Sequence, residues 1–268
     1  GKRLIFSRSF GLIADNKGEK TMKQSKVFAH RGASQYAPEN TLEAFRLAME
    51  QGAEGIELDV HLSADGELVV IHDETLERTT NGTGLVKEHT LAQLQALRAD
   101  NHMEGFEAAR IPTLRQVLEL VRPGDMQVNI ELKTGILWYE GIEKKTLELV
   151  KELGMQDRVV YSSFNHYSIE EVRRLDPTAE TAYLFSDVIF EVEKYAARRG
   201  VKGLHPALWH VKMADFLTDY LQSGLAVRVW TVNRPEDMRL LMERGVDAVI
   251  TNDPALALQV RAELEEKE

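Results

Sequence analysis

The chain has 268 residues, of which 43% are hydrophobic and 28% charged, a composition typical of a soluble globular protein. Its formal net charge of -10 at pH 7 disfavours nonspecific binding to nucleic acid or anionic membranes. The absence of cysteine excludes disulfides, thiolate nucleophiles and cysteine-bound zinc, so any metal must be held by oxygen or imidazole ligands.

Residues 1–21 contain short apolar runs, but Arg8 and two serines interrupt what would be the apolar region of a secretory signal. We expect this segment to be a poorly ordered leader or tag-derived extension, and residues 22–268 to form a single domain. No apolar run approaches the roughly 20 residues needed to span a bilayer. The sequence therefore predicts a cytoplasmic protein that is not integral to membranes.

From Val27 onward, short apolar runs alternate with amphipathic segments that often end in glycine, as at Gly52 and Gly245. Glycine at these places is typical of the end of a helix that leads into a strand. Eight strands are expected, near residues 27–29, 56–61, 127–132, 158–163, 181–185, 203–206, 226–232 and 247–251.

Helix starts are marked by capping-box patterns at residues 40–43, 90–93, 113–116 and 168–171, and by an N-cap followed by proline at Asp253-Pro254. Eight strands alternating with helices, with no Gly-x-Gly-x-x-Gly after the first strand, favour a closed (β/α)₈ TIM barrel over an open doubly wound sheet.

Residues 63–110 exceed the usual length of a βα loop, so they predict a small insertion after the second strand. We expect it to contain the return strand of a hairpin and a short helix near residues 90–98.

The second strand has a charged face where a buried face is expected. Glu57 and Asp59 alternate with apolar residues, so they project from one side of the strand. A two-residue turn at Asp65-Gly66 would pair Asp59 with His72, with Cβ atoms roughly 5 Å apart. Burying such a cluster without a cation costs several kcal/mol per ion, so the sequence predicts a metal, an acid–base pair, or both.

Further polar residues fall at the ends of other strands, where barrels place their catalytic groups. The third strand ends with Glu131 and Lys133 on one face. Together with Glu57 and Asp59, Glu131 completes a set of three carboxylates suited to Ca²⁺ or Mg²⁺.

The first strand ends at His30 and Arg31. His30 and His72 are then available for proton transfer, and Arg31 and Lys133 supply positive charge for an anion.

Several short motifs occur together over residues 27–254, and their order and spacing are more specific than any one of them. They are His30-Arg-Gly32, Pro38-Glu-Asn-Thr41, Glu57-Leu-Asp-Val60, Val70-Ile-His-Asp73 with Leu76 and Arg78-Thr-Thr80, Ile111-Pro-Thr-Leu114, Ile130-Glu-Leu-Lys133, Val229-Trp-Thr-Val-Asn233 and Ile250-Thr-Asn-Asp-Pro254. With these motifs the chain resembles the bacterial, cytoplasmic-type glycerophosphodiester phosphodiesterases.

The resemblance implies a barrel enzyme whose small-molecule substrate is a glycerophosphodiester, hydrolysed to sn-glycerol 3-phosphate and an alcohol. It implies one divalent cation, Ca²⁺ or Mg²⁺ with Mn²⁺ as a further candidate, on Glu57, Asp59 and Glu131. It also implies that His30 and His72 are the acid–base pair, in an order that the sequence leaves open. The substrate would contact Arg31 and Lys133 through its phosphate, and Trp230 and Phe164 through its glycerol or alcohol.

Asn40 either caps the first helix or lines the substrate site, and the two roles can coexist. Five of the other histidines are assigned structural roles: His61, His89, His166, His205 and His210.

Two alternatives to this function remain at this stage. The first is a phospholipase C- or D-like enzyme that acts on intact or lyso-phospholipid, although the sequence has neither a long amphipathic loop nor a basic patch for membrane docking. The second is a catalytically silent barrel, which predicts a gap among the candidate residues, and none is missing.

Overall fold

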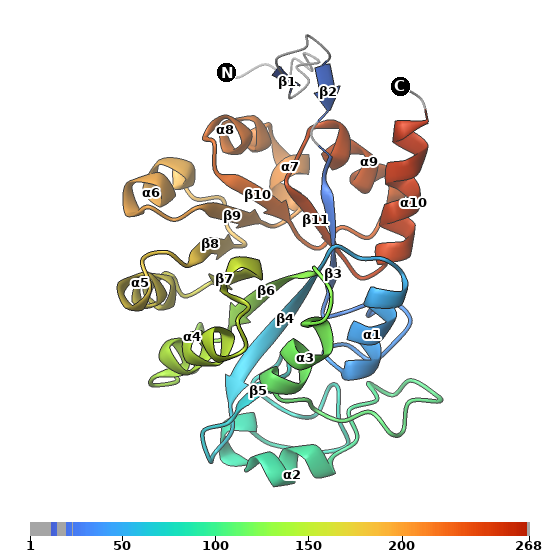
Figure 1. Cartoon of the computed structure of the whole chain (residues 1–268), viewed down its shortest axis with the longest axis vertical. Coiled ribbons are helices and arrows are strands. Elements are labelled where there is room, and N and C mark those ends of the chain that lie inside the picture. Colours follow the sequence, from blue (N-terminus) through green and yellow to red (C-terminus); the bar gives the residue numbers. More distant parts are fainter. Residues whose placement is uncertain (1–11, 15–19, 23, 267–268) are drawn as a thin grey trace.

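The computed structural model describes residues 12–14, 20–22 and 24–266, and its centre is a closed barrel of eight parallel strands (Figure 1). Around the barrel each strand pairs with its neighbours in the order β3, β4, β6, β7, β8, β9, β10, β11, and the last pairs with β3. The strands are β3 Lys26–His30, β4 Gly55–Leu62, β6 Gln127–Leu132, β7 Val159–Ser163, β8 Glu180–Phe185, β9 Gly203–Pro206, β10 Ala226–Val229 and β11 Ala248–Thr251. The predicted (β/α)₈ barrel is confirmed, although β10 ends three residues before the expected residue 232.

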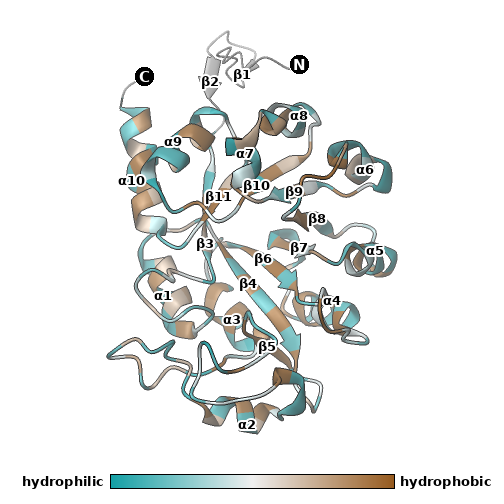
Figure 2. Ribbon diagram, turned by 180° about the vertical axis from the view of Figure 1, so that it is seen from behind, coloured by the Kyte–Doolittle hydropathy of each residue, from teal (hydrophilic) through white to brown (hydrophobic). Residues whose placement is uncertain are grey.

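Helices surround the barrel (Figure 1). They are α1 Leu42–Glu50, α3 Leu114–Val121, α4 Ile142–Glu152, α5 His166–Leu175, α6 Val192–Arg199, α7 Trp209–Met213, α8 Phe216–Gln222, α9 Pro235–Glu243 and α10 Pro254–Glu265, with a 3-10 turn η2 at Gln156–Arg158. Figure 2 shows apolar and polar residues on different sides of many of these helices. Their apolar sides pack with one face of the strands, so the other face of each strand points into the barrel.

The predicted helix starts are confirmed at three places and differ at two. Thr90 and Thr113 each form a capping box, and Asp253 caps α10 through the Leu256 amide. The N-cap of α1 is Thr41, because the Asn40 side chain turns toward the barrel. The expected start of α5 at Ser168 is wrong: Asn165 caps this helix by accepting from the Tyr167 amide.

The insertion after β4 forms a small layer at one side of the barrel. It contains β5 Leu68–Val70, the 3-10 helix η1 Val86–Glu88 and α2 Leu91–Ala96. Its buried apolar residues form a cluster distinct from the two large clusters around the barrel: Val69, Ile71, Leu76, Val86, Leu94, Ala99 and Ile111.

The register predicted for the β4–β5 hairpin is wrong by one residue. Ser63 and Glu67 close a three-residue loop, in which Gly66 adopts a φ of 80°. A loop with a left-handed glycine in this position adds one residue relative to a two-residue turn. His61 therefore pairs with Val69, and the Ile71 amide, one residue before His72, donates to the Asp59 carbonyl at 3.1 Å.

Polar side chains also fill part of the barrel interior below the mouth. Arg228 binds Glu180 at 2.6 Å and lies 3.3 Å from Nε2 of His205. The amide of Asn129 is 3.5 Å from Nδ1 of the same ring and accepts from the Ser162 hydroxyl at 2.8 Å. In this network the polar side chains inside the barrel satisfy one another's hydrogen-bonding capacity.

Before the barrel, β1 Leu12–Ala14 pairs antiparallel with β2 Lys20–Met22. The expected leader spans residues 1–21, and its other residues, 1–11 and 15–19, lie outside the described residues. Poor order of this leader therefore stays a prediction. Among the described residues, no helix has the length and apolar character required to traverse a bilayer.

Candidate active site

A pocket of about 100 Å³ opens at the ends of the barrel strands. Its lining residues come from seven strands and their following loops: His30, Arg31, Glu57, His72, Asn129, Glu131, Phe164, Leu184, Trp230 and Ile250. The carboxyl ends of parallel strands meet at one end of a barrel, which is why residues so far apart in sequence meet here.

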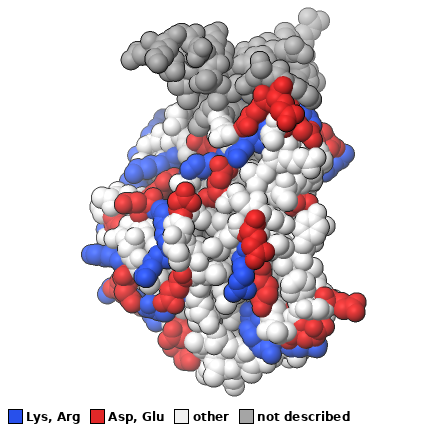
Figure 3. All heavy atoms as spheres, turned by 45° about the vertical axis from the view of Figure 1, so that its right-hand side comes forward, with Lys and Arg blue, Asp and Glu red and all other residues white. Residues whose placement is uncertain are grey.

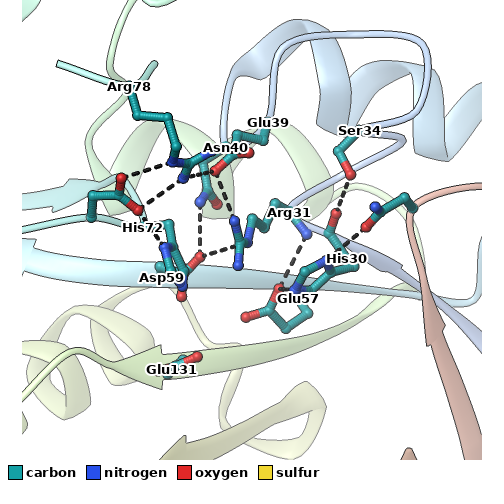
Figure 4. A network of polar contacts seen from close by, with 12 residues as sticks. His30, Arg31, Ser34, Glu39, Asn40, Glu57, Asp59, His72, Arg78 and Glu131 are labelled. Atoms are coloured by element: carbon teal, nitrogen blue, oxygen red, sulfur yellow. Dashed lines mark hydrogen bonds and ion pairs between the residues drawn. The ribbon is translucent and has the colours of Figure 1, made fainter. Parts of the chain in front are cut away.

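The strand register brings the candidate carboxylates together. Glu57 on β4 lies beside His30 on β3, and Asp59 on β4 lies beside Glu131 on β6. Each of the three carboxylates is buried, and they offer oxygen atoms that all lie within 4.8 Å of one another. Figure 4 shows Glu57 and Asp59 on the same strand with Glu131 beside them.

The three carboxylates have different electrostatic environments. Burial, with repulsion from Asp59 and Glu131, raises the pKa of Glu57 well above its ordinary value. Burial also raises the pKa of Glu131 to about 7, against the opposing effect of Lys133. Burial disfavours ionisation of Asp59 as well, but Arg31 and other cationic neighbours hold its pKa below its ordinary value.

The cluster has the properties of a cation site. Oδ1 of Asp59 is buried and has no hydrogen-bond partner, while its Oδ2 accepts from the Asn40 amide at 2.9 Å. A buried carboxylate oxygen without a hydrogen-bond donor, beside two other carboxylates, is what a hard divalent ion stabilises. The residues present therefore fit a divalent cation.

His30 is held at the edge of this cluster by a neutral partner. Its Nδ1 lies 2.7 Å from Oδ1 of Asn252, which follows β11. Its Nε2 faces Oε2 of Glu57 at 3.8 Å. Burial and the charge of Arg31 lower the pKa of His30 to about 4, so the ring is neutral near pH 7.

His72 is held by a charged partner instead. Its Nδ1 lies 2.6 Å from Oδ1 of Asp73, and Arg78 contacts both oxygens of that carboxylate at 2.7 and 2.9 Å. The hydrogen bond from Arg78 lowers the pKa of Asp73 below its ordinary value. Arg78 also binds Glu39, which binds Arg31, and Figure 4 shows this chain of contacts from the insertion to the loop after β3.

The two candidate phosphate-binding cations lie beside the carboxylates. Nε of Arg31 is 3.6 Å from Asp59, and Nζ of Lys133 is 3.1 Å from Glu131. Burial disfavours the charged form of Lys133, but Glu131 and Asp59 raise its pKa above the ordinary value. Lys133 also lies 3.3 Å from Nε2 of His72.

The apolar wall of the pocket is aromatic. The rings of Trp230 and Phe164 pack edge to face, with centroids 5.6 Å apart, and the Trp230 indole donates to the His205 carbonyl at 2.8 Å. Phe164 is 40% exposed, so its ring lies at the open side of the pocket. Trp230 is not plain barrel core, because it lines the pocket and is only partly buried.

The structure places all ten candidate residues at this mouth, but their spatial relations differ from expectation in two respects. The backbone of Asp59 pairs with Ile71 and not with His72. Asn40 contacts Asp59 and does not cap a helix. The residues that orient the two histidines, Asn252 and Asp73, were not singled out from the sequence. Both stood within the quoted motifs, and the dipeptide His72-Asp73 was the available signal for the second.

A barrel with a buried carboxylate triad, two oriented histidines and two cations at one mouth defines a hydrolase for phosphate esters. Comparison with known proteins narrows this class. The chain belongs to the glycerophosphoryl diester phosphodiesterase family, whose model matches residues 30–256. The resemblance and the enzyme class predicted from sequence are thereby confirmed.

Relatives match over most of their length. A glycerophosphodiester phosphodiesterase of Caldanaerobacter subterraneus subsp. tengcongensis is 45% identical over 229 residues, which cover 85% of this chain and 94% of the relative. One from Bacillus altitudinis is 41% identical, covering 90% of this chain and 99% of the relative.

Solved structures agree with the fold and the family. A phosphodiesterase of Oleispira antarctica, in complex with the product sn-glycerol-3-phosphate, superposes with a TM-score of 0.80 at 32% identity, covering 88% of this chain and 96% of the other. A glycerophosphodiester phosphodiesterase of Agrobacterium tumefaciens gives 0.77 at 32% identity, covering 88% and 99%.

Proposed function

We propose that this protein hydrolyses glycerophosphodiesters to sn-glycerol 3-phosphate and an alcohol, with one divalent cation and two histidines. The observation that supports this most strongly is that Glu57 and Glu131, which form one carboxylate cluster with the buried Asp59, line a single pocket together with His30 and His72. The reaction requires neutralisation of charge on the phosphate oxygens and a proton for the leaving alcohol. The pocket contains groups for both tasks.

The cation would be held by Glu57, Asp59 and Glu131, which are hard oxygen ligands that suit Ca²⁺, Mg²⁺ or Mn²⁺. When bound, it would supply positive charge for a nonbridging phosphate oxygen. Arg31 and Lys133 border the same carboxylates, so they would hold the other phosphate oxygens.

We assign the base to His30 and the acid to His72 from their orienting partners. Asn252 is neutral and accepts the Nδ1 proton of His30, which leaves Nε2 free to accept a proton from the attacking hydroxyl group. Asp73 is anionic and stabilises a protonated His72, whose Nε2 would protonate the leaving alcohol. In this structure Nζ of Lys133 lies 3.3 Å from Nε2 of His72 and occupies the side from which the alcohol would be protonated. The assignment therefore requires Lys133 to turn toward the phosphate when substrate binds.

A second candidate substrate is a glycerophosphodiester that retains one acyl chain. Trp230 contacts Trp209 with ring centroids 5.8 Å apart, so the aromatic wall extends outward from the pocket. Exposed apolar side chains follow several strands at the same mouth: Ile136, Trp138, Phe164, Tyr167, Phe190 and Trp209. Figure 3 shows, on the described part of one face, Lys and Arg interspersed with Asp and Glu and no continuous basic patch. A single chain on a monomeric substrate suits this surface better than an anionic bilayer.

The decisive experiment measures release of sn-glycerol 3-phosphate from glycerophosphocholine and glycerophosphoethanolamine, and of acylglycerol 3-phosphate from a lysophospholipid, after chelation and after adding back Ca²⁺, Mg²⁺ or Mn²⁺. We expect the two water-soluble diesters to be cleaved only with a metal. No cleavage under any metal would refute the proposed function, and cleavage of the lysophospholipid alone would establish the second candidate. A cytoplasmic location stays a prediction.

A further inference from the structure

His61 was assigned a structural role from sequence, but its contacts connect it to His72. It lies on β4 two residues beyond Asp59, where the strand pairs with β5, and its side chain is fully buried. Its Nε2 lies 3.0 Å from the His72 carbonyl oxygen, and its Nδ1 lies 2.9 Å from the Tyr139 hydroxyl. The Tyr139 ring packs edge to face on the imidazole, with centroids 5.6 Å apart.

The partners define which nitrogen has the proton. A carbonyl oxygen can only accept, so Nε2 of His61 donates to His72. In the neutral ring Nδ1 is then an acceptor, and the Tyr139 hydroxyl donates to it. The His72 carbonyl therefore fixes the tautomer of His61, and Tyr139 helps to fix the orientation of its ring.

These contacts act on the peptide between His72 and Asp73. The β-ladder reaches Ile71, whose amide binds the Asp59 carbonyl, and the His61 side chain holds the chain one residue further. That peptide joins the imidazole of His72 to the carboxylate that orients it. Tyr139 comes from the segment after β6 that also contains Lys133. His72 is therefore in contact with this segment twice, through His61 to Tyr139 and directly to Lys133.

We infer that His61 and Tyr139 form a buried positioning pair that sets the height and angle of the His72 imidazole over the pocket. The inference rests on the proposed function. Displacement of a catalytic group by about 1 Å can lower turnover by about 100-fold, so small changes in this pair are expected to be visible in kcat.

The test uses substitutions that keep or remove one hydrogen bond. In His61→Gln the amide nitrogen can occupy the place of Nε2 and donate to His72, whereas in His61→Asn the amide is too short to reach it. Tyr139→Phe removes only the hydroxyl. We expect His61→Asn to lower kcat on glycerophosphoethanolamine by about 10- to 100-fold, with KM within about twofold of the wild-type value. Tyr139→Phe should lower kcat several-fold. The kcat of His61→Gln should stay within about threefold of the wild-type value.

The chain offers a matched control pair away from His72. His210 lies 2.9 Å from the Ser186 carbonyl through Nε2 and 3.4 Å from the Tyr220 hydroxyl through Nδ1, and it is buried as fully as His61. His210→Asn and Tyr220→Phe remove the same kinds of contact without touching the insertion. We expect both to retain the wild-type kcat.

A second substrate separates positioning of His72 from general loss of structure. The p-nitrophenyl ester of glycerol 3-phosphate releases an anion that needs no proton, so a misplaced acid should not slow its cleavage. We expect His61→Asn and Tyr139→Phe to cleave this ester at nearly the wild-type rate while losing activity on glycerophosphoethanolamine. Equal loss on both esters would overturn the inference.

Other results would also overturn it: wild-type kcat in His61→Asn, equal activity of the Gln and Asn variants, or equal losses in the His210 controls. Tyr139→Phe keeps the ring and its packing, so it decides the question if His61→Asn does not fold. A wild-type protein inactive on every diester with every metal would refute the proposed function itself. An active wild type with an unaffected Tyr139→Phe variant would refute the positioning pair alone.

Discussion

The ammonium of Lys133 lies 3.1 Å from Oε1 of Glu131, so one of the three candidate cation ligands already has a positively charged partner. Lys133 is also 3.9 Å from Asp59, which places it over the middle of the triad. A divalent cation would therefore enter a site where a proton and an ammonium group already compensate the carboxylates.

Cation affinity is predicted to increase with pH. Burial raises the pKa of Glu131 to about 7, so below that pH a proton occupies the carboxylate and competes with the metal. We expect the Kd for Mn²⁺ to fall by up to about tenfold per pH unit from pH 5.5 to 7. Isothermal titration calorimetry measures this, with the exposed Glu50→Gln as control. A Kd that is equal at pH 5.5 and 7.5 would contradict the competition.

Glu57→Gln is predicted to stabilise the metal-free protein while it abolishes activity. The raised pKa of Glu57 means that its contribution to stability is present below the unfolded-state pKa and is lost as pH rises toward the folded value. Glutamine removes the buried charge and can still accept from the Arg31 amide, now 3.1 Å from Glu57. We expect Tm in chelator to rise by a few degrees at pH 8 and not at pH 5, and kcat to fall at least about 100-fold. A lower Tm at pH 8 would show that the carboxylate is not a source of strain.

Replacing His30 or His72 by alanine is predicted to lower kcat by about two to four orders of magnitude, because each variant loses one proton transfer. Neither change removes a core contact, so the circular dichroism spectrum and the melting transition should remain. The natural comparison is His89→Ala, because the Nδ1 atom of His89 lies 2.8 Å from the Leu85 carbonyl oxygen within the insertion. Wild-type turnover in His30→Ala or His72→Ala would refute the assignment.

Asn252→Asp is predicted to move the acidic limb of the pH profile upward. His30 has a pKa of about 4 with the neutral amide beside it, and a base must be unprotonated to act. A carboxylate in the same place would stabilise the imidazolium and raise that pKa. At a metal concentration that saturates the site at every pH, we expect the pH of half-maximal kcat on the acid side to rise by about one unit or more, with the basic limb unchanged. An unmoved acidic limb would mean that His30 is not the base.

The barrel could be predicted because each element has a local signal. Alternating strands, capping residues such as Thr90 and Thr113, and glycines after helices all agree, and their positions match the structure closely. The carboxylates could be found because charged residues on a buried strand have few structural explanations.

The hairpin register could not be predicted, because Asp65-Gly66 fits both a two-residue turn and a three-residue loop with a left-handed glycine. The pairing energies beyond the loop decide between them, and these depend on packing of the insertion. Asn252 was missed for a related reason: an asparagine beside an N-capping Asp253 has an ordinary local explanation, and its contact with His30 spans 222 residues.

The separate apolar cluster of the insertion has a consequence for how the enzyme would fail under stress. His72 belongs to a segment stabilised by that small cluster, whereas the carboxylates lie on β4 and β6 in the barrel. Parts of a protein with fewer buried contacts open at lower free energy than the global transition. Amides of residues near 76–99 should exchange faster with deuterium than those of β6, and thermal inactivation should precede melting of the barrel. His72, the proposed general acid, would then leave its position while Glu57, Asp59 and Glu131 stay together.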